Sequence, residues 1–154
     1  MALSPNVAAQ PNTAESAAPE VGIWYDDTGK GAVEIAPCGS QFCGHIVWLS
    51  DPNHENGQPL KDVYNPEPTR RNQPICGLQV LGKLTRQSDG SLDSGWVYDP
   101  KVGKAYNAEV RTVGNSQLAV RGYLSLKLLG KTLMWQRAPD NLERCDAPVA
   151  ARAG

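Results

Sequence analysis

Residues 104–124 read KAYNAEVRTVGNSQLAVRGYL, and this stretch decides the fold class. Polar and apolar side chains alternate through Lys104–Val113 and again through Gln117–Leu124, and the pair Gly114-Asn115 stands between the two runs. A period of two predicts a half-buried β-strand, and Gly next to Asn favours a tight turn. The stretch therefore predicts a β-hairpin, which is the basic unit of an antiparallel sheet.

The same strand signals recur along most of the chain, with turn residues between them at Asp27–Gly31, Ser88–Gly90 and Asp99–Gly103. The predicted strands are Val21–Tyr25, Ala32–Pro37, Gly44–Leu49, Ile75–Leu84, Gly95–Tyr98, Lys104–Val113, Gln117–Leu124 and Lys131–Arg137. Because tight turns rather than helical crossovers join them, we expect an all-β fold of antiparallel strands. About eight such strands can close into an up-and-down barrel, which removes the exposed edges of the sheet.

One segment interrupts the strand pattern. Ser50–Pro74 is mostly polar and rich in turn residues, and it forms a long loop between the third and fourth predicted strands. Loops longer than about 12–15 residues are uncommon in compact domains and often serve as lids or binding loops. Two interpretations stay open here, a lid over a binding site or a structural strap packed across one end of the barrel.

The length of 154 residues fits one domain. Residues 1–20 are rich in Ala, Pro, Ser and Asn and poor in large apolar side chains, so we expect a flexible leader left after removal of a signal peptide. A disordered cytosolic N-terminus is the alternative. We expect the barrel domain to span residues 21–146 and a disordered tail to occupy residues 147–154.

Charge and hydropathy argue against two functional classes, nucleic-acid-binding proteins and membrane-spanning proteins. The net charge is −1 and the pI about 6.1, whereas nucleic-acid-binding domains usually show a clustered basic excess. The chain also lacks an apolar run of about 18 residues, the minimum for a membrane-spanning helix. We therefore expect neither nucleic-acid binding nor a membrane span, and we expect a monomer or weak dimer.

Four cysteines occur, Cys38, Cys43, Cys76 and Cys145. Cys38 and Cys43 flank a short turn between two predicted strands, where opposed positions come within disulfide reach. This spacing predicts the pairs Cys38–Cys43 and Cys76–Cys145, and disulfides indicate a periplasmic or secreted protein. The alternative is four reduced, buried thiols in a cytosolic protein.

Two features resemble those of lipocalins. Gly22-Ile23-Trp24 on the first predicted strand matches their Gly-x-Trp signature, and Arg137 on the last strand matches the basic residue that covers that tryptophan. An arginine stacked on a tryptophan gains roughly 0.5–2 kcal/mol. The resemblance implies a lipocalin-like (calycin-type) barrel in which Trp24 and Arg137 have a structural role.

A second resemblance, to the bacterial family of unknown function DUF2147, extends from about Val21 to Ala138. The matching positions are Val33-Glu34-Ile35, Cys43 to Leu49, Asp62, Asn65-Pro66, Arg71, Pro74, Gly77-Leu78, Tyr98-Asp99-Pro100, Gly103-Lys104, Tyr106, Arg121-Gly122-Tyr123, Gly130 and Trp135-Gln136-Arg137. The family usually reads Arg-x-Arg-Pro where this chain reads Arg71-Asn72-Gln73-Pro74, and this departure weakens the case for an anion clamp of two arginines. The resemblance implies an exported protein of Gram-negative bacteria and supplies no catalytic residue.

The sequence carries no motif for catalysis, metal binding or a cofactor. The two histidines, His45 and His54, stand outside any nucleophile signature such as Gly-x-Ser-x-Gly. The cysteines form no CxxC or Cys/His cluster, which argues against zinc, and no glycine-rich phosphate loop is present. We therefore name no catalytic residue, no metal ligand and no cofactor.

The candidate ligand-binding residues are polar groups that a barrel mouth would gather, namely Asp62, Asn65, Arg71, Tyr98, Tyr106, Arg121 and Tyr123. An ion pair between Asp62 and Arg71 that pins the long loop is the structural alternative for those two. Arg121 has the stronger claim to a ligand, because a charge inside a barrel needs a partner and an anionic ligand supplies one.

The leading functional hypothesis is an extracytoplasmic binding protein for a small, partly apolar molecule. The hypothesis includes an anionic ligand. Two alternatives remain, a small enzyme acting on a component of the cell envelope, and an envelope-stress or interaction protein with a filled barrel. The state of the cavity distinguishes them. An open cavity favours binding, a cleft with perturbed titratable groups favours an enzyme, and a filled barrel with an exposed apolar patch favours a protein partner.

Overall fold

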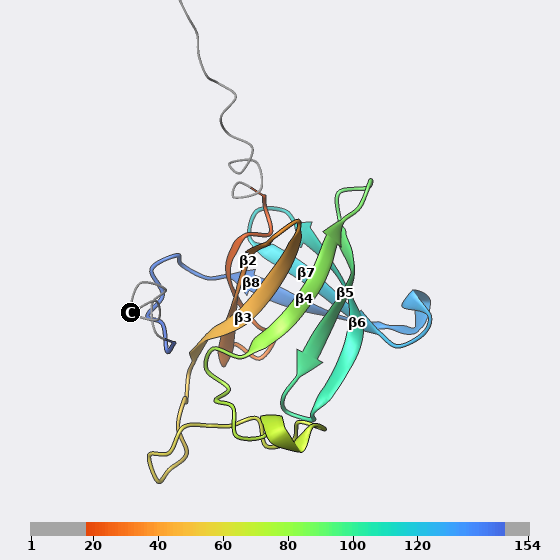
Figure 1. Cartoon of the computed structure of the whole chain (residues 1–154). Coiled ribbons are helices and arrows are strands. Elements are labelled where there is room, and N and C mark those ends of the chain that lie inside the picture. Colours follow the sequence, from red (N-terminus) through yellow and green to blue (C-terminus); the bar gives the residue numbers. More distant parts are fainter. Residues whose placement is uncertain (1–17, 147–154) are drawn as a thin grey trace, which may run out of the picture.

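The computed structural model describes residues 18–146, which form a closed barrel of eight strands (Figure 1). The elements are β1 (Gly22–Tyr25), β2 (Gly31–Cys38), β3 (Gln41–Leu49), the short 3-10 helix η1 (Pro68–Arg70), β4 (Gln79–Arg86), β5 (Leu92–Asp99), β6 (Lys104–Val113), β7 (Gln117–Tyr123), the 3-10 helix η2 (Lys127–Leu129) and β8 (Lys131–Arg137). The expected leader and tail lie outside the described residues, apart from Ala18, Pro19 and Glu20 at the end of the predicted leader.

The barrel is antiparallel throughout and follows the order of the chain. Each strand pairs with the next, and β1 pairs with β8 through Trp24 opposite Arg137 and Tyr25 opposite Gln136. These pairings confirm the predicted up-and-down barrel, with a long segment, residues 50–78, between β3 and β4. No helix in this described part of the chain is long and apolar enough to cross a membrane.

One continuous hydrophobic cluster fills the interior of the barrel. Its largest fully buried side chains come from strands on all sides and are Trp24, Ile35, Leu81, Leu84, Leu92 and Leu118. They lie inside because the apolar positions of each strand alternate with polar ones and share one face of the sheet. Because these side chains are fully buried against one another, a ligand inside the barrel would have to displace some of them.

Trp24 closes one end of the barrel, and Arg137 covers it. The guanidinium carbon of Arg137 lies 3.9 Å from the centroid of the Trp24 ring, and its Nη1 and Nη2 donate to the carbonyls of Val21 (2.9 Å) and Pro19 (2.8 Å). Gly22 makes this approach feasible, because a Cβ there would lie 2.3 Å from Arg137 Nη1. Gly22 also has φ +135, which side-chain-bearing residues rarely adopt. The Gly-x-Trp signature thus has a steric cause in this chain.

A second hydrophobic cluster lies on the outside of the barrel. Ile23, Ala32 and Val47 from β1, β2 and β3 pack against Ala138 and the partly buried Leu142, which follow β8. Residues 138–146, the C-terminal segment, therefore cover the outer face of the first three strands. The backbone N–H of Cys145 donates to the carbonyl of Val47 (2.7 Å) and fixes the far end of this segment.

Both predicted disulfides are confirmed. Cys38–Cys43 and Cys76–Cys145 have Cα–Cα distances of 5.8 and 6.0 Å. The register corrects the reason given for the first pair, because Cys38 lies opposite Gln41 and Cys43 lies opposite Ala36. The two cysteines are therefore diagonal neighbours across the β2–β3 turn rather than opposed residues.

The fourth strand begins later than the sequence predicts. Ile75–Leu78 has the apolar character of a strand, but Gly77 has φ +89 and this stretch bonds to Leu60 and Ile46 as part of the long segment. The simple alternation also fails within β4, where Val80 and Leu81 are both buried and Lys83 has φ +55. A local irregularity in the strand backbone explains this change of face.

Candidate functional site

The segment 50–78, here called the strap, is an ordered structure rather than an open loop. Two isolated bridges hold it, Asn53 with Pro59 and Lys61 with Pro74. The helix η1 forms one turn within the loop that the second bridge closes. In Figure 1 the strap runs from the end of β3 around one end of the barrel and returns to β4. Its conformation places polar side chains against the barrel wall.

Asp62 is the centre of a buried hydrogen-bonded group, here called the strap latch. Its side chain is 0% exposed, and Asn65 is 8% exposed. The hydroxyl of Tyr98 on β5 donates to Asp62 Oδ1 at 2.7 Å, and Asn65 Nδ2 donates to Asp62 Oδ2 at 2.7 Å. Each oxygen of the buried carboxylate thus has a partner, as buried polar groups require.

Arg71 joins the latch without pairing with the carboxylate. Its Nε donates to the carbonyl of Asn65 at 2.7 Å, while Asn65 Oδ1 accepts the backbone N–H of Glu67 at 2.8 Å. The contact expected between Asp62 and Arg71 is therefore replaced by hydrogen bonds through Asn65. The neutral hydroxyl of Tyr98 links the strap to the barrel at this point, and Arg71 stabilises the latch from within the strap.

Tyr98 responds to the carboxylate beside it. Burial of the phenol, together with the hydrogen bond to Asp62 and the charge of that group, raises the pKa of Tyr98 well above its ordinary value of 10.0. The folded protein therefore retains the phenolic proton at a pH where the unfolded chain has lost it. This contribution to stability is complete below about pH 10 and is lost as the pH rises toward the pKa of the folded state.

We expect Tyr98→Phe to lower the free energy of unfolding by about 1–3 kcal/mol, because Asp62 Oδ1 then lacks its buried donor. Urea denaturation at pH 7 measures the loss. The difference in stability between the wild type and the variant should shrink above pH 10, where the phenol ionises in the unfolded chain. Tyr25→Phe, a change at a partly buried tyrosine outside the latch, is the matched control. An equal loss in both variants would contradict the role of the latch.

The remaining predicted residues lie away from the latch. Tyr106 is partly buried on β6, where Gly122 lies beside its Cβ position and Lys104 Nζ lies 5.9 Å from its ring centroid. Arg121 and Tyr123 lie on the outer face of β7, because Leu118 and Val120 take the interior positions of that strand. The premise that Arg121 lies inside the barrel is therefore wrong.

The guanidinium of Arg121 is used by the protein itself. Arg121 donates to the carbonyls of Lys127 (2.9 Å) and Leu128 (3.2 Å) and to Thr132 Oγ1 (2.7 Å). Tyr123 donates its hydroxyl to Asp93 Oδ1 at 3.1 Å. The seven predicted residues thus fall in three places, the latch, the inner wall near Tyr106, and the outer face of β7.

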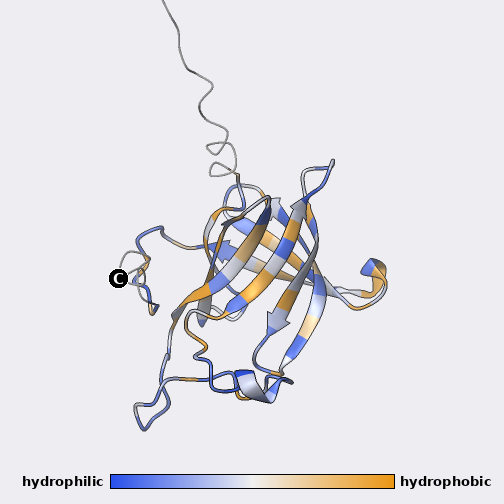
Figure 2. Ribbon diagram, viewed as in Figure 1, coloured by the Kyte–Doolittle hydropathy of each residue, from blue (hydrophilic) through white to orange (hydrophobic). Residues whose placement is uncertain are grey.

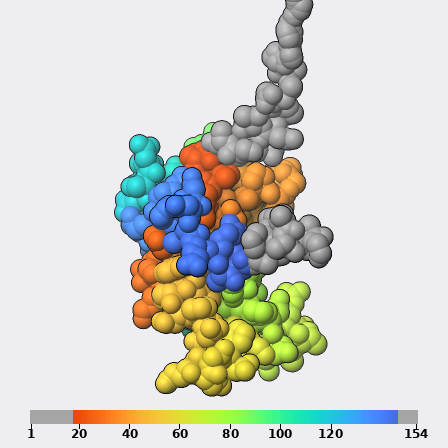
Figure 3. All heavy atoms as spheres, turned by 90° about the vertical axis from the view of Figure 1, so that its left-hand side faces the viewer, coloured from red at the N-terminus to blue at the C-terminus, as the bar shows by residue number. Residues whose placement is uncertain are grey.

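A groove of about 790 Å³ lies between the strap, β3, β4 and the end of the C-terminal segment. We call it the strap groove. Its lining combines apolar surface, neutral hydrogen-bonding groups and one carboxylate that is paired with Arg144. The lining residues are His45, Pro52, Asn53, Pro59, Gln73, Pro74, Cys76, Gly77, Leu78, Gln79, Cys145 and Asp146. Figure 3 shows one face of the molecule on which the C-terminal segment (blue) lies above the strap (yellow).

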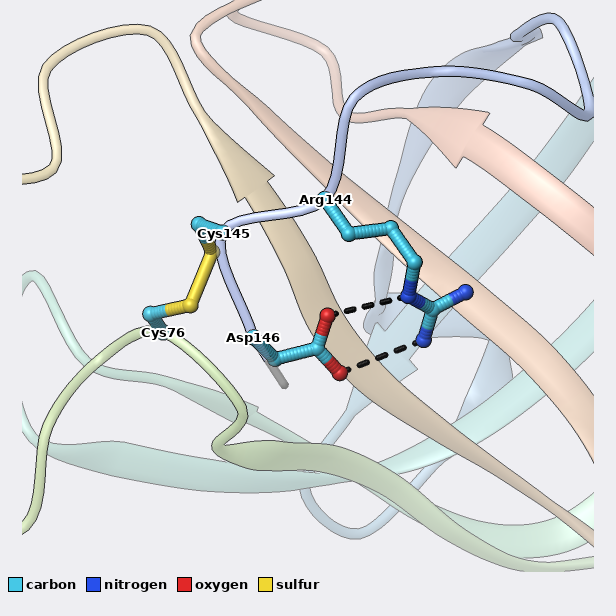
Figure 4. The surroundings of a disulfide bond; sticks show 4 residues. All are labelled: Cys76, Arg144, Cys145 and Asp146. Carbon is cyan, nitrogen blue, oxygen red and sulfur yellow. Dashed lines mark hydrogen bonds and ion pairs between the residues drawn. A yellow bond between two sulfur atoms is a disulfide. The ribbon is translucent and has the colours of Figure 1, made fainter. Parts of the chain in front are cut away.

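The Cys76–Cys145 disulfide fixes one wall of the strap groove (Figure 4). Beside it, Arg144 forms a two-point ion pair with Asp146 at 3.0 and 3.2 Å and donates to Glu34 at 2.9 Å. The hydrogen bonds to Glu34 and Asp146 raise the pKa of Arg144 above its already high value. Arg144 thus bridges the two carboxylates at this edge of the groove, and the three groups together carry a net charge of −1.

A smaller groove of about 350 Å³ lies next to the β1–β2 turn. Outward-facing residues of β8, Met134 and Gln136, form one wall, and Tyr25 and the turn form the rest. Among residues 18–146, no group of three or more His, Cys, Asp or Glu side chains could hold a metal ion.

The sequence predicts that the strap is a lid or a structural segment, but it does not identify most of the side chains that line the strap groove. His45 and Gln79 alternate outward on β3 and β4, which is visible in the period of two, yet nothing in the sequence shows that these strands lie beside the strap. Only the two cysteines link the strap to the C-terminal segment in the sequence.

Comparison with protein families covers the whole barrel. Residues 22–137 match the family described as an uncharacterized protein conserved in bacteria (DUF2147). The chain belongs to the DUF2147 family. This confirms the resemblance seen in the sequence. Among curated proteins, none matches the chain.

The DUF2147 barrel also resembles a solved structure. That structure is described as protein HP1028 from the human pathogen Helicobacter pylori, which belongs to the lipocalin family. The TM-score is 0.69 at 24% sequence identity, and the match covers 85% of this chain and 93% of HP1028. The likeness confirms the lipocalin-like fold.

Several positions that carry the DUF2147 resemblance meet in the strap latch, namely Asp62, Asn65 and Tyr98. Another set, Arg121-Gly122-Tyr123, supports the turn between β7 and β8. In this DUF2147 protein these positions hold the strap and a turn in place, and none of these six residues lines either groove.

Proposed function

We propose that this protein is an extracytoplasmic binding protein that holds a small, neutral, partly apolar molecule in the strap groove. The observation that carries the proposal is the groove itself. Its volume of about 790 Å³ falls within the roughly 300–1,000 Å³ typical of small-molecule sites.

The barrel interior is filled, which by itself favours a protein partner, but the strap groove is an open site outside the barrel, and we therefore place the ligand there. A ligand inside would have to displace side chains such as Leu81 and Leu118, which are fully buried. Deleting or displacing core packing costs several kcal/mol. A ligand in the strap groove meets a surface that is already formed.

The lining of the groove suggests the chemistry of the ligand. Pro52, Pro59 and Leu78 provide apolar surface, and the side chains of Asn53 and Gln79 are neutral hydrogen-bonding groups. The carboxylate of Asp146 is paired with Arg144, and the guanidinium of Arg121 bonds to the protein elsewhere. These features favour a neutral ligand with an apolar part and an amide or hydroxyl group over an anionic ligand.

The two disulfides support the extracytoplasmic part of the proposal. The Cys76–Cys145 disulfide forms part of the groove wall, and Cys38–Cys43 closes the β2–β3 turn. Disulfides persist in oxidising compartments and are rare in the cytosol of mesophiles. The groove is thus suited to the periplasm or the exterior of the cell.

The neutral fluorophore N-phenyl-1-naphthylamine tests this proposal with the oxidised protein. We expect saturable binding at one site, weakened at least about tenfold by Gln79→Trp, which places an indole in the strap groove. Gln136→Trp makes the same change in the smaller groove and is expected to leave binding unchanged. Native mass spectrometry of protein from its own cell envelope then identifies the bound molecule. Equal affinity in the wild type and Gln79→Trp would reject the site.

A further inference from the structure

Four exposed leucines gather in the turn between β7 and β8. Residues 124–130, here called the leucine loop, contain Leu124, Leu126, Leu128 and Leu129, which are 62%, 61%, 86% and 76% exposed. Figure 1 shows this loop projecting from the barrel beyond β6 and β7, and Figure 2 shows hydrophobic colour at its tip. Single exposed leucines are common, but a cluster on a projecting loop marks an interaction site.

The leucine loop is held firmly in this exposed position. Arg121 donates three hydrogen bonds into the loop and its far end, to the carbonyls of Lys127 and Leu128 and to Thr132. Gly130 packs so closely on β7 that a Cβ there would lie 2.5 Å from the carbonyl oxygen of Gly122. The loop is therefore built to point its leucines away from the barrel.

Lys127 anchors the same loop from below. Its ammonium pairs with Asp93 and lies 3.4 Å from Glu109 Oε2, and it also lies 5.8 Å from the Tyr123 ring centroid. These contacts satisfy the lysine and the two carboxylates beneath it. Among residues 18–146, the neighbouring leucines have no corresponding partner and are exposed.

Cationic side chains outnumber acidic ones at the base of the leucine loop. Lys127 pairs with Asp93 and Glu109, whereas Arg121 bonds to carbonyl and hydroxyl oxygens and has no salt bridge among the described residues. Lys131 follows the loop directly and is exposed. Exposed apolar side chains beside cations are the features that hold a protein on an anionic lipid surface.

We propose that the leucine loop inserts into the surface of a lipid bilayer that contains anionic lipids. A narrow projecting tip suits entry between lipid headgroups, whereas a stable protein interface usually buries about 800 Å² on each partner. The loop anchors the protein peripherally and leaves the strap groove, which other strands form, accessible. This inference is independent of the ligand proposed for the groove.

Sedimentation with large unilamellar vesicles tests the inference. We expect the oxidised wild type to sediment with vesicles of phosphatidylcholine and phosphatidylglycerol, and much less with phosphatidylcholine alone. Leu128→Ser with Leu129→Ser removes the two most exposed leucines and is expected to weaken binding at least about tenfold. Both side chains are in solvent, so the variant should retain the melting temperature of the wild type.

A matched control carries the same chemical change elsewhere. Val63→Ser with Val113→Ser replaces two exposed apolar side chains outside the loop, 54% and 44% exposed, and should bind the vesicles as the wild type does. Wild-type protein that stays in the supernatant, or that sediments equally with both types of vesicle, would overturn the proposal. Self-association lost only in the leucine variant, without vesicle binding, would identify the loop as a protein interface instead. N-phenyl-1-naphthylamine binding should be the same in all three proteins.

Discussion

Replacement of Trp24 by alanine is expected to lower the free energy of unfolding by about 3–5 kcal/mol. The Trp24 side chain is 1% exposed, its Nε1 donates to the carbonyl of Glu20 at 2.9 Å, and its ring supports the guanidinium of Arg137. Truncation removes the ring from the core and leaves Arg137 without the surface on which it stacks. Because domains of this size are stable by only about 5–15 kcal/mol, the variant should approach the limit of folding at 37 °C.

Urea denaturation followed by far-UV circular dichroism measures the effect. Trp24→Phe retains an aromatic ring but loses the indole donor, and we expect it to cost only about 1–2 kcal/mol. Trp48→Ala is the matched control, because Trp48 lies on the outer face, where it contacts Tyr25 edge-on with ring centroids 5.5 Å apart. A loss in Trp48→Ala as large as that in Trp24→Ala would argue against a special role for the Trp24 end of the barrel.

Removal of the Cys76–Cys145 disulfide by a double alanine substitution is expected to cost about 4 kcal/mol. The bond spans 69 residues, and a cross-link over such a length removes much of the conformational freedom of the unfolded chain. It also fixes the C-terminal segment over Ala32 and Val47. We therefore expect the backbone amide of Cys145, now alanine, to exchange with deuterium much faster.

The second disulfide supplies the control. Cys38–Cys43 spans only five residues, so the corresponding double alanine variant should lose about 2 kcal/mol. Both losses are measured by urea denaturation without reductant, and the wild type with reductant should approach the sum of the two. Equal losses from the two variants would show that chain length within the loop does not determine the effect here.

Regular alternation explains why most strands could be predicted from the sequence. The bounds of β6 and β8 agree with the predicted Lys104–Val113 and Lys131–Arg137, because alternation there is unbroken and turn residues flank both strands. The beginning of β4 could not be predicted, because Ile75–Leu78 is as apolar as a strand although it belongs to the strap. This stretch hydrogen-bonds to Ile46 and Leu60 rather than continuing the strand.

The candidate site was harder to predict than the fold. Local spacing indicated that the strap matters, but it gave no means to tell that Asp62 bonds to Tyr98 on β5 rather than to Arg71. Likewise, the alternation in β7 places Arg121 outside the barrel, but its partners in the leucine loop depend on how that loop folds back. Contacts between segments distant in sequence carry this information, and residue types alone do not.

The pairing of β1 with β8 constrains the order in which the strands of the barrel can pair. Each of the other strand pairs joins neighbours along the chain, so those hairpins can form as soon as their two strands are available. Closure must wait for β8, and until then both edge strands are exposed to wrong partners. An incomplete chain of this design therefore stays open at both edges until β8 is available to complete the circle.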